Sequence, residues 1–240
     1  VATSGEIDSS LRRTVEHLQS ETAAVSIERA VTASGRLEID VAVRNLAGHK
    51  FPTAYPSRRA WLHVTVRDQD GRTVFESGAI RANGLIQGND NDIDPGRYEP
   101  HYTEIRQPDQ VQIYESIMVD SNGAVTTGLL TGLRYVKDNR LLPRGFDKAS
   151  AEPDIAVIGD ASKDSDFVDG RDTVRYSIDI AGASRPLQIE VELRFQPISF
   201  RWADNLRKYD APEPKRFVGY YDAMSTASSE IISRATATAR

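Results

Sequence analysis

Apolar and polar residues alternate along most of the chain between Val25 and Phe195. Because successive side chains of a strand point to opposite faces of a sheet, this period of two predicts strands with one buried and one solvated face. The predicted strands are 25–31, 37–43, 62–66, 74–75, 111–119, 155–158, 173–180 and 187–195. Such strands suit two packed antiparallel sheets better than a parallel sheet that is covered on both faces.

Two pairs of these strands are separated by short turn sequences. The first turn is Ala33-Ser34-Gly35-Arg36, and the second is Asp68-Gln69-Asp70-Gly71. Glycine and aspartate tolerate the positive φ angles that tight hairpin turns require. We therefore predict two β-hairpins in the first third of the chain.

Both ends of the chain change to a helical period. Capping residues Asp8 and Ser9 precede an apolar stripe, Leu11, Val15 and Leu18, which predicts a short amphipathic helix. Residues 202–208 predict a second short helix. After two prolines, apolar and small residues spaced by four and three positions predict a long amphipathic helix; they are Phe217, Tyr221, Met224, Ser228 and Ile231.

Together these patterns predict an all-β fold with helical ends. We expect an antiparallel β-sandwich, immunoglobulin-like or jelly-roll-like, with a short N-terminal helix and a long C-terminal amphipathic helix. The expected parts are a helix and connector at 1–22, the sandwich at 23–200 and C-terminal helices at 201–240.

The composition excludes several classes of function. With 30 basic and 35 acidic residues the net charge is −5, so no overall positive field favours nucleic acid. No apolar run approaches the roughly 20 residues that span a bilayer. The chain has no cysteine, which excludes disulfides, thiolate metal sites and the CxxCH attachment of c-type haem. No GxSxG, phosphate-binding or dinucleotide-binding motif is present, and we do not expect this chain to be an enzyme.

A long loop at 45–59 lies between two predicted strands and has the sequence NLAGHKFPTAYPSRR. Connections in compact domains are typically about 4–6 residues long, so an ordered loop of this length indicates a function. It contains His49 and concentrates Lys50, Arg58 and Arg59 in an acidic chain.

From this loop onward, the segment NLAGHKFPTAYPSRRAWLHVTVRDQDGRTVFESG resembles a segment of bacterial multihaem c-type cytochromes that follows their CxxCH repeats. The stretches EPHYTEI, QVQIYESIM, KDNRLLPRGFDK and DSDFVDGRDTVRY are similar to later parts of the same proteins, so the resemblance runs from about Val25 onward. It implies a haem-free C-terminal domain of an exported, periplasmic electron-transfer protein. Its expected partner is an upstream haem-bearing region of the same polypeptide, to which the segment 1–22 would connect. The C-terminal helices would pack on the sandwich or on that haem-bearing region.

The missing CxxCH motif means that haem c belongs to the expected parent protein, not to this chain. The chain begins at Val1 without a signal peptide, and we expect it to be a fragment. The resemblance makes His49 a candidate axial ligand of a haem iron, with Lys50, Arg58 and Arg59 as candidate partners of haem propionates. The alternative is that His49 caps its own loop and the arginines pair with local carboxylates.

His101 is a second candidate for contact with a haem or metal, although a hydrogen-bonded structural histidine is the alternative. Three carboxylates in the segment 88–96 are candidate calcium ligands, Asp90, Asp92 and Asp94, with a solvated acidic turn as the alternative. A second acidic cluster is likewise either a calcium site or a solvated turn; it comprises Asp160, Asp164, Asp166, Asp169 and Asp172.

Glu115 falls on the apolar side of its predicted strand, where its carboxylate needs a partner, most simply an arginine. The loop 138–146, which carries two arginines, is a candidate docking surface.

The sequence leaves three hypotheses for the function of the chain. The leading one is a structural or docking domain of a multihaem cytochrome. The alternative is a stand-alone sandwich that binds a carbohydrate or protein ligand through aromatic residues such as Trp61, Tyr55 and Tyr98, stabilised by calcium. A hydrolase with dispersed carboxylates ranks last.

Overall fold

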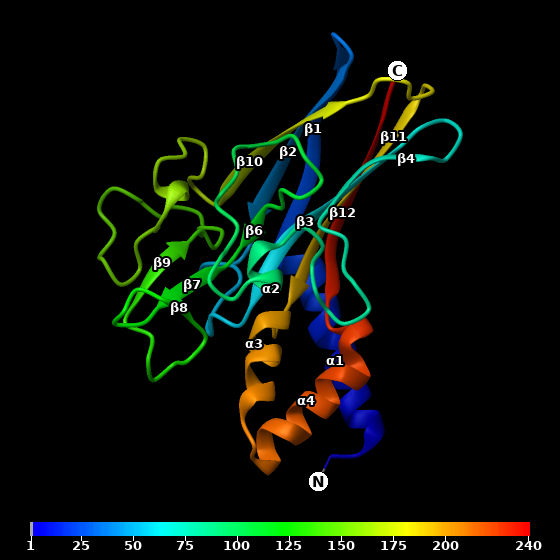
Figure 1. Ribbon diagram of the computed structural model, residues 1–240. Helices are drawn as coiled ribbons and strands as arrows, with labels where there is room; N and C mark the ends of the chain where they lie inside the picture. Colours follow the sequence, from blue (N-terminus) through cyan, green and yellow to red (C-terminus); the bar gives the residue numbers. More distant parts are fainter. Residues whose placement is uncertain (1) are drawn as a thin grey trace.

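The alternating strands form two facing sheets in the computed structural model, which describes residues 2–240 (Figure 1). The first sheet has the order β1 (Ala23–Ala33), β2 (Arg36–Asn45), β10 (Arg171–Asp179) and β5 (Glu104–Ile105). The second has the order β12 (Glu230–Ala239), β11 (Leu187–Gln196), β3 (Arg59–Arg67) and β4 (Thr73–Ser77), with β6 (Ile113–Tyr114) also paired to β3. All of these pairs are antiparallel except β10 with β5.

A smaller sheet stands beside the sandwich, with the order β8 (Val125–Thr126), β7 (Ser116–Val119) and β9 (Arg134–Asp138) (Figure 1). The helices are α1 (Ser4–His17), α2 (Asp90–Ile93), α3 (Phe200–Asp204) and α4 (Pro212–Met224). Helices α1, α3 and α4 gather at the end of the sandwich where the N-terminus lies, opposite the C-terminus. The predicted all-β sandwich with helical ends is confirmed. No helix in the described part of the chain is long and apolar enough to cross a membrane.

The main core fills the space between the two sheets. It is built from the inward residues of the alternating strands, including Leu37, Ile39 and Val41 of β2 and Leu62, Val64 and Val66 of β3. The opposite face of β3 is covered as well, because Trp61 is fully buried against Ile86, Val111 and Ile113. Strand β3 is thus buried on both faces, which explains why buried and exposed residues do not alternate along it.

Both predicted hairpins, β1–β2 and β3–β4, are present. Four other predictions need correction. The predicted strand 111–119 is interrupted at Glu115, and its two halves, β6 and β7, pair in different sheets. Residues 155–158 form no strand, and Ile158 contributes one isolated bridge to Asp138.

The prediction of helix through Ile231 and up to residue 240 is wrong, because helix α4 ends at Met224 and residues 230–239 form β12 at the edge of the second sheet. The strand has its own physical reason. Polar Arg234, Thr236 and Thr238 alternate with alanines that pack against the core, a period of two that the helical spacing of the preceding residues obscured.

The N-terminal helix begins earlier than expected. Thr3 caps it by accepting from the Glu6 backbone N–H, and the Thr3 backbone N–H donates to the Glu6 carboxylate, which forms a complete capping box. None of the residues of α1 is buried. Ile7 and Leu11 are exposed on this helix, whereas Val15, one turn further on, is half-buried.

On the outer face of the second sheet, the His63 ring lies between two carboxylates. Its Nδ1 is 3.1 Å from Glu192, and its Nε2 is 3.0 Å from Glu76. Burial lowers the pKa of His63, but the hydrogen bonds and charges of Glu192 and Glu76 outweigh burial and raise this pKa above its ordinary value. The contact joins strands β3, β4 and β11.

We expect the free energy of unfolding to fall as the pH rises above 6.5, the ordinary pKa of histidine, and through the raised pKa of folded His63. The pKa of His63 is higher in the folded than in the unfolded chain, so its stabilising contribution is complete below the unfolded value and is lost as the pH passes the folded value. Urea unfolding at intervals of half a pH unit measures this. The variant His63→Gln should flatten the curve in this range, and a curve that keeps its wild-type slope would contradict the assignment.

Candidate functional site

The loop that carries His49 is held from within by Asn45. The Asn45 amide donates to the carbonyl of His49 (2.7 Å) and to that of Leu141 (3.1 Å). Phe51 is buried and pairs with Leu141 through two backbone hydrogen bonds. The His49 side chain is exposed, its Nδ1 lies 3.0 Å from the Lys50 carbonyl oxygen, and its Nε2 has no hydrogen-bond partner among residues 2–240.

The three cations of this loop contact protein groups. Lys50 donates to Asp138 (2.8 Å) and to a backbone carbonyl, and burial lowers its pKa. Arg58 donates to the Thr53 carbonyl (3.3 Å). Arg59 is 1% exposed and forms two hydrogen bonds with Asp92, at 2.8 and 2.9 Å. Arg59 is therefore inaccessible to a haem propionate, and that prediction is wrong.

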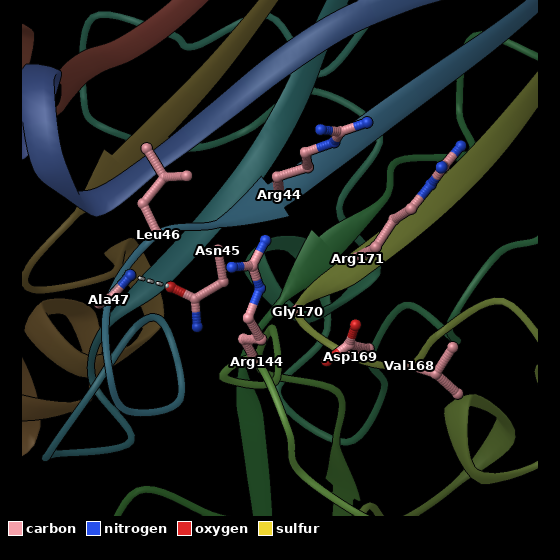
Figure 2. Close-up of a pocket in the computed structure, with 9 residues that line it drawn as sticks. All are labelled: Arg44, Asn45, Leu46, Ala47, Arg144, Val168, Asp169, Gly170 and Arg171. Carbon is pink, nitrogen blue, oxygen red and sulfur yellow. Dashed lines mark hydrogen bonds between the residues drawn. The ribbon is translucent and has the colours of Figure 1, made fainter.

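A hollow of about 520 Å³ lies where the loop leaves strand β2 (Figure 2). Three arginines line it: Arg44 is the residue before the last of β2, Arg171 begins β10, and Arg144 comes from the loop 138–146. Its other lining residues are Asn45, Leu46, Ala47, Val168, Asp169 and Gly170. Arg44 and Arg171 are missed by motif reasoning because each lies in a strand, and only the pairing of β2 with β10 brings them together.

The candidate calcium ligands do not converge. Asp90 pairs with Arg97 (2.5 Å), Asp92 pairs with Arg59, and Asp94 accepts a hydrogen bond from the Gly96 backbone (2.8 Å). Asp92 also accepts from a backbone amide and is fully buried, so a cation there would have to displace Arg59. This geometry favours a structural turn over a calcium loop.

We expect chelation to leave the protein's stability unchanged. Addition of EDTA to the purified chain should shift its melting temperature by less than about 1 °C, since the carboxylates at 90–94 already have protein partners. Thermal unfolding with EDTA and with excess CaCl₂ measures this. A calcium-dependent rise in the melting temperature would contradict the assignment of Asp92 to the ion pair.

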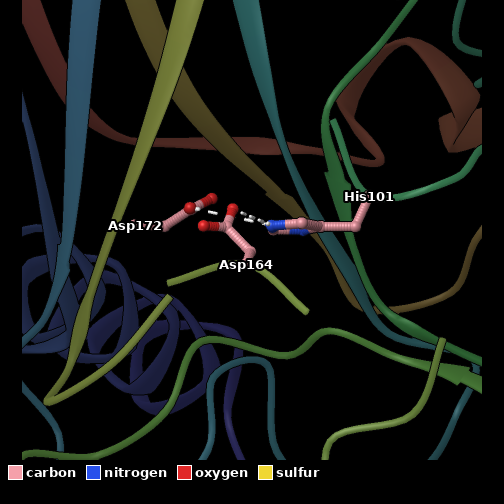
Figure 3. A group of neighbouring side chains, drawn as sticks. All are labelled: His101, Asp164 and Asp172. Carbon is pink, nitrogen blue, oxygen red and sulfur yellow. Dashed lines mark hydrogen bonds and ion pairs between the residues drawn. The ribbon is translucent and has the colours of Figure 1, made fainter. Parts of the chain in front are cut away.

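A buried group of three ionisable side chains forms around Asp172, near the start of β10 (Figure 3). The Nε2 atom of His101 is 3.1 Å from Asp164 and 3.7 Å from Asp172, and the potential ligand atoms lie within 4.8 Å of one another. The sequence analysis proposed His101 as a contact for a haem or metal and both aspartates as members of an acidic cluster, but it did not predict that they meet. Tyr114 donates to Asp172 at 2.6 Å, and the second oxygen of Asp172 has no hydrogen-bond partner in the described structure.

The other nitrogen of His101 argues against a metal ion here. Nδ1 faces the amide nitrogens of Gln112 (2.9 Å) and Asn139 (3.1 Å). Both amides are fixed in orientation, since their oxygens accept from the backbone of Tyr102 and Glu115. Nδ1 is therefore an acceptor, which places the ring proton on Nε2, where a metal would bind.

The carboxylates around His101 have perturbed pKa values. Burial raises the pKa of Asp164, but hydrogen bonds from His101 and the Asp166 backbone outweigh burial and lower it to about 2. Burial and the neighbouring Asp164 raise the pKa of Asp166 to about 6. Burial also raises the pKa of Asp172. The hydrogen bond from His101 Nε2 thus favours the ionised form of the Asp164 carboxyl.

The structure also decides the predictions for Glu115 and Trp61. Glu115 is paired, with Lys137 (2.9 Å) instead of an arginine. Trp61 is fully buried and donates from Nε1 to the Gly78 carbonyl (2.8 Å), so it cannot face a carbohydrate. Tyr55 is 62% exposed and Tyr98 is half-buried.

Comparison with known proteins gives one likeness of fold. The chain is similar to the crystal structure of a penta-heme cytochrome c552 from Thermochromatium tepidum, with a TM-score of 0.55 and 15% sequence identity. The likeness covers 93% of this chain and 40% of that chain. At this identity it shows a shared fold. No protein-family model matches, and no curated protein is similar in sequence.

Proposed function

We propose that this chain is a haem-free domain of a larger multihaem c-type cytochrome, and that it packs beside the haem-bearing part. The observation that carries the proposal is the likeness to the penta-heme cytochrome c552, which extends over 93% of this chain and only 40% of that protein. A chain without cysteine cannot attach haem covalently, so its role in electron transfer is to dock and to shield haems. The proposal places the protein outside the cytoplasm, where multihaem cytochromes are exported.

Helix α1 supplies a surface for docking. Ile7 is 58% exposed and Leu11 is 61% exposed in the first part of this helix. At the same end of the molecule, Tyr220 and Met224 of α4 are also exposed. Exposed large apolar side chains on an amphipathic helix are typical of a surface that another part of a protein covers.

We expect the double variant Ile7→Asp, Leu11→Asp to have different effects in two settings. In the 240-residue chain it should change the free energy of unfolding by less than about 1 kcal/mol, because both side chains are exposed. In the full-length protein it should destabilise this domain by about 2 kcal/mol or more, because each residue loses burial in the interface. Hydrogen exchange of α1 in both settings measures the difference, and equal effects would contradict docking through α1.

The full-length protein also provides the direct test of the proposal. Its coding sequence upstream of Val1 should encode CxxCH repeats and an export signal; their absence would overturn the proposed function.

His49, with its exposed ring, remains the candidate axial ligand of a haem iron. Replacement of His49 by alanine in the haem-loaded protein should convert one haem from low spin to high spin. An unchanged spectrum and unchanged reduction potentials would remove His49 as a ligand.

A further inference from the structure

We propose that the hollow lined by Arg44, Arg144 and Arg171 binds a propionate carboxylate of a haem in the neighbouring part of the protein. The inference rests on the proposed function and assigns the propionate contact to residues other than those nominated from the loop sequence. Lys50 and Arg59 hold buried carboxylates inside the fold, whereas Arg44 and Arg171 are partly exposed and share one partly exposed carboxylate, Glu28.

Strand pairing sets two of the positive charges side by side. Arg44 and Arg171 are direct partners in the antiparallel register of β2 and β10. Like charges at directly opposite positions repel each other. Both side chains turn to one carboxylate, Glu28 of β1, at 2.5 Å from Arg171 and 3.9 Å from Arg44. An anion bound between the two guanidinium groups would relieve the remaining repulsion.

Arg144 adds a third guanidinium to the hollow. Its side chain forms no hydrogen bond or ion pair with any residue from 2 to 240. The second carboxylate nearby, Asp169, accepts a hydrogen bond from the Gly145 backbone (2.8 Å). Three guanidinium groups thus face two carboxylates, Glu28 and Asp169, and one positive charge is uncompensated in a chain of net charge −5.

The residues that line the hollow suit a ligand that carries a carboxylate on an apolar ring. Guanidinium groups bind carboxylates through two parallel hydrogen bonds. The apolar side chains of Leu46 and Val168 line the same hollow and are 54% and 40% exposed. A haem edge has this combination of a propionate carboxylate and a flat apolar ring. Asn45, which also lines the hollow, holds the carbonyl of His49, so one loop joins the two candidate haem contacts.

The test uses the 240-residue chain, which has its own core between the two sheets. The probe is a haem c peptide, a proteolytic fragment of a cytochrome c that keeps its haem and both free propionates. Binding is followed by the NMR signals of the backbone amides, and we expect saturable changes at Ala47 and Gly170. The variant Arg144→Gln should weaken binding about tenfold or more.

Two controls separate a built site from general charge attraction. Arg106→Gln removes another exposed arginine, which pairs with Glu104 outside the hollow, and it should leave the affinity unchanged. The same peptide with both propionates esterified should not bind at Ala47 and Gly170. The inference is overturned if Arg144→Gln binds like the wild type, if the ester binds as tightly as the acid, or if the wild type shows no changes there. The proposed function is judged separately, by the upstream CxxCH repeats and the α1 variants.

Discussion

Replacement of Arg59 by methionine is expected to lower the free energy of unfolding by about 3–5 kcal/mol. Arg59 is 1% exposed, and its guanidinium satisfies both oxygens of Asp92 and the side-chain oxygen of Gln196. Methionine keeps much of the volume but leaves the Asp92 charge buried beside an apolar chain. The cost is that of an uncompensated buried carboxylate. Urea unfolding at pH 7 measures it.

The neighbouring residue provides a matched control. Arg58→Met removes the same charge one position earlier, but Arg58 donates one hydrogen bond to a loop carbonyl and is partly exposed. Its loss should cost less than about 1 kcal/mol. The double variant Arg59→Met, Asp92→Leu should recover part of the loss, because no unpaired charge remains. Equal effects of Arg58→Met and Arg59→Met would contradict the buried ion pair.

The sandwich was predictable because its strands alternate strongly and their hairpin turns are local signals. Strand β11 and hairpin β1–β2 follow from the residues within each segment. The C-terminal strand was not predictable in this way. Its alternating alanines and threonines carry little apolar contrast, and only the open edge of β11 decides that they pair as a strand.

The site was predictable only in part, for the same reason. His49 stands out in its loop, and its exposure leaves its chemistry open. The sequence shows that Arg59 and Asp92 are charged but not that they meet, since 33 residues separate them. The arginines of the hollow come from two strands and a loop, so their convergence depends on the register of β2 and β10. Long-range pairing, unlike periodicity, leaves no local pattern.

Replacement of His101 by leucine is expected to lower the free energy of unfolding at pH 7 by about 3–5 kcal/mol. The His101 ring accepts hydrogen bonds from the buried amides of Gln112 and Asn139 and donates one to Asp164. A leucine leaves both amide donors without this acceptor and Asp164 without this donor, and each unsatisfied buried group costs about 1–3 kcal/mol. Urea unfolding measures the loss.

The acid branch of the stability curve distinguishes this network from simple loss of packing. The pKa of Asp164 is lowered to about 2 in the folded protein from an ordinary value of 3.8. Its contribution is therefore present above pH 4 and is lost as the pH falls toward 2. In His101→Leu this loss should shrink between pH 4 and 2, since the lowered pKa depends on the His101 hydrogen bond. Asp166, with its pKa raised to about 6, titrates in a separate range. A variant that is less stable at pH 7 but keeps the wild-type acid slope would show that His101 acts only by filling space.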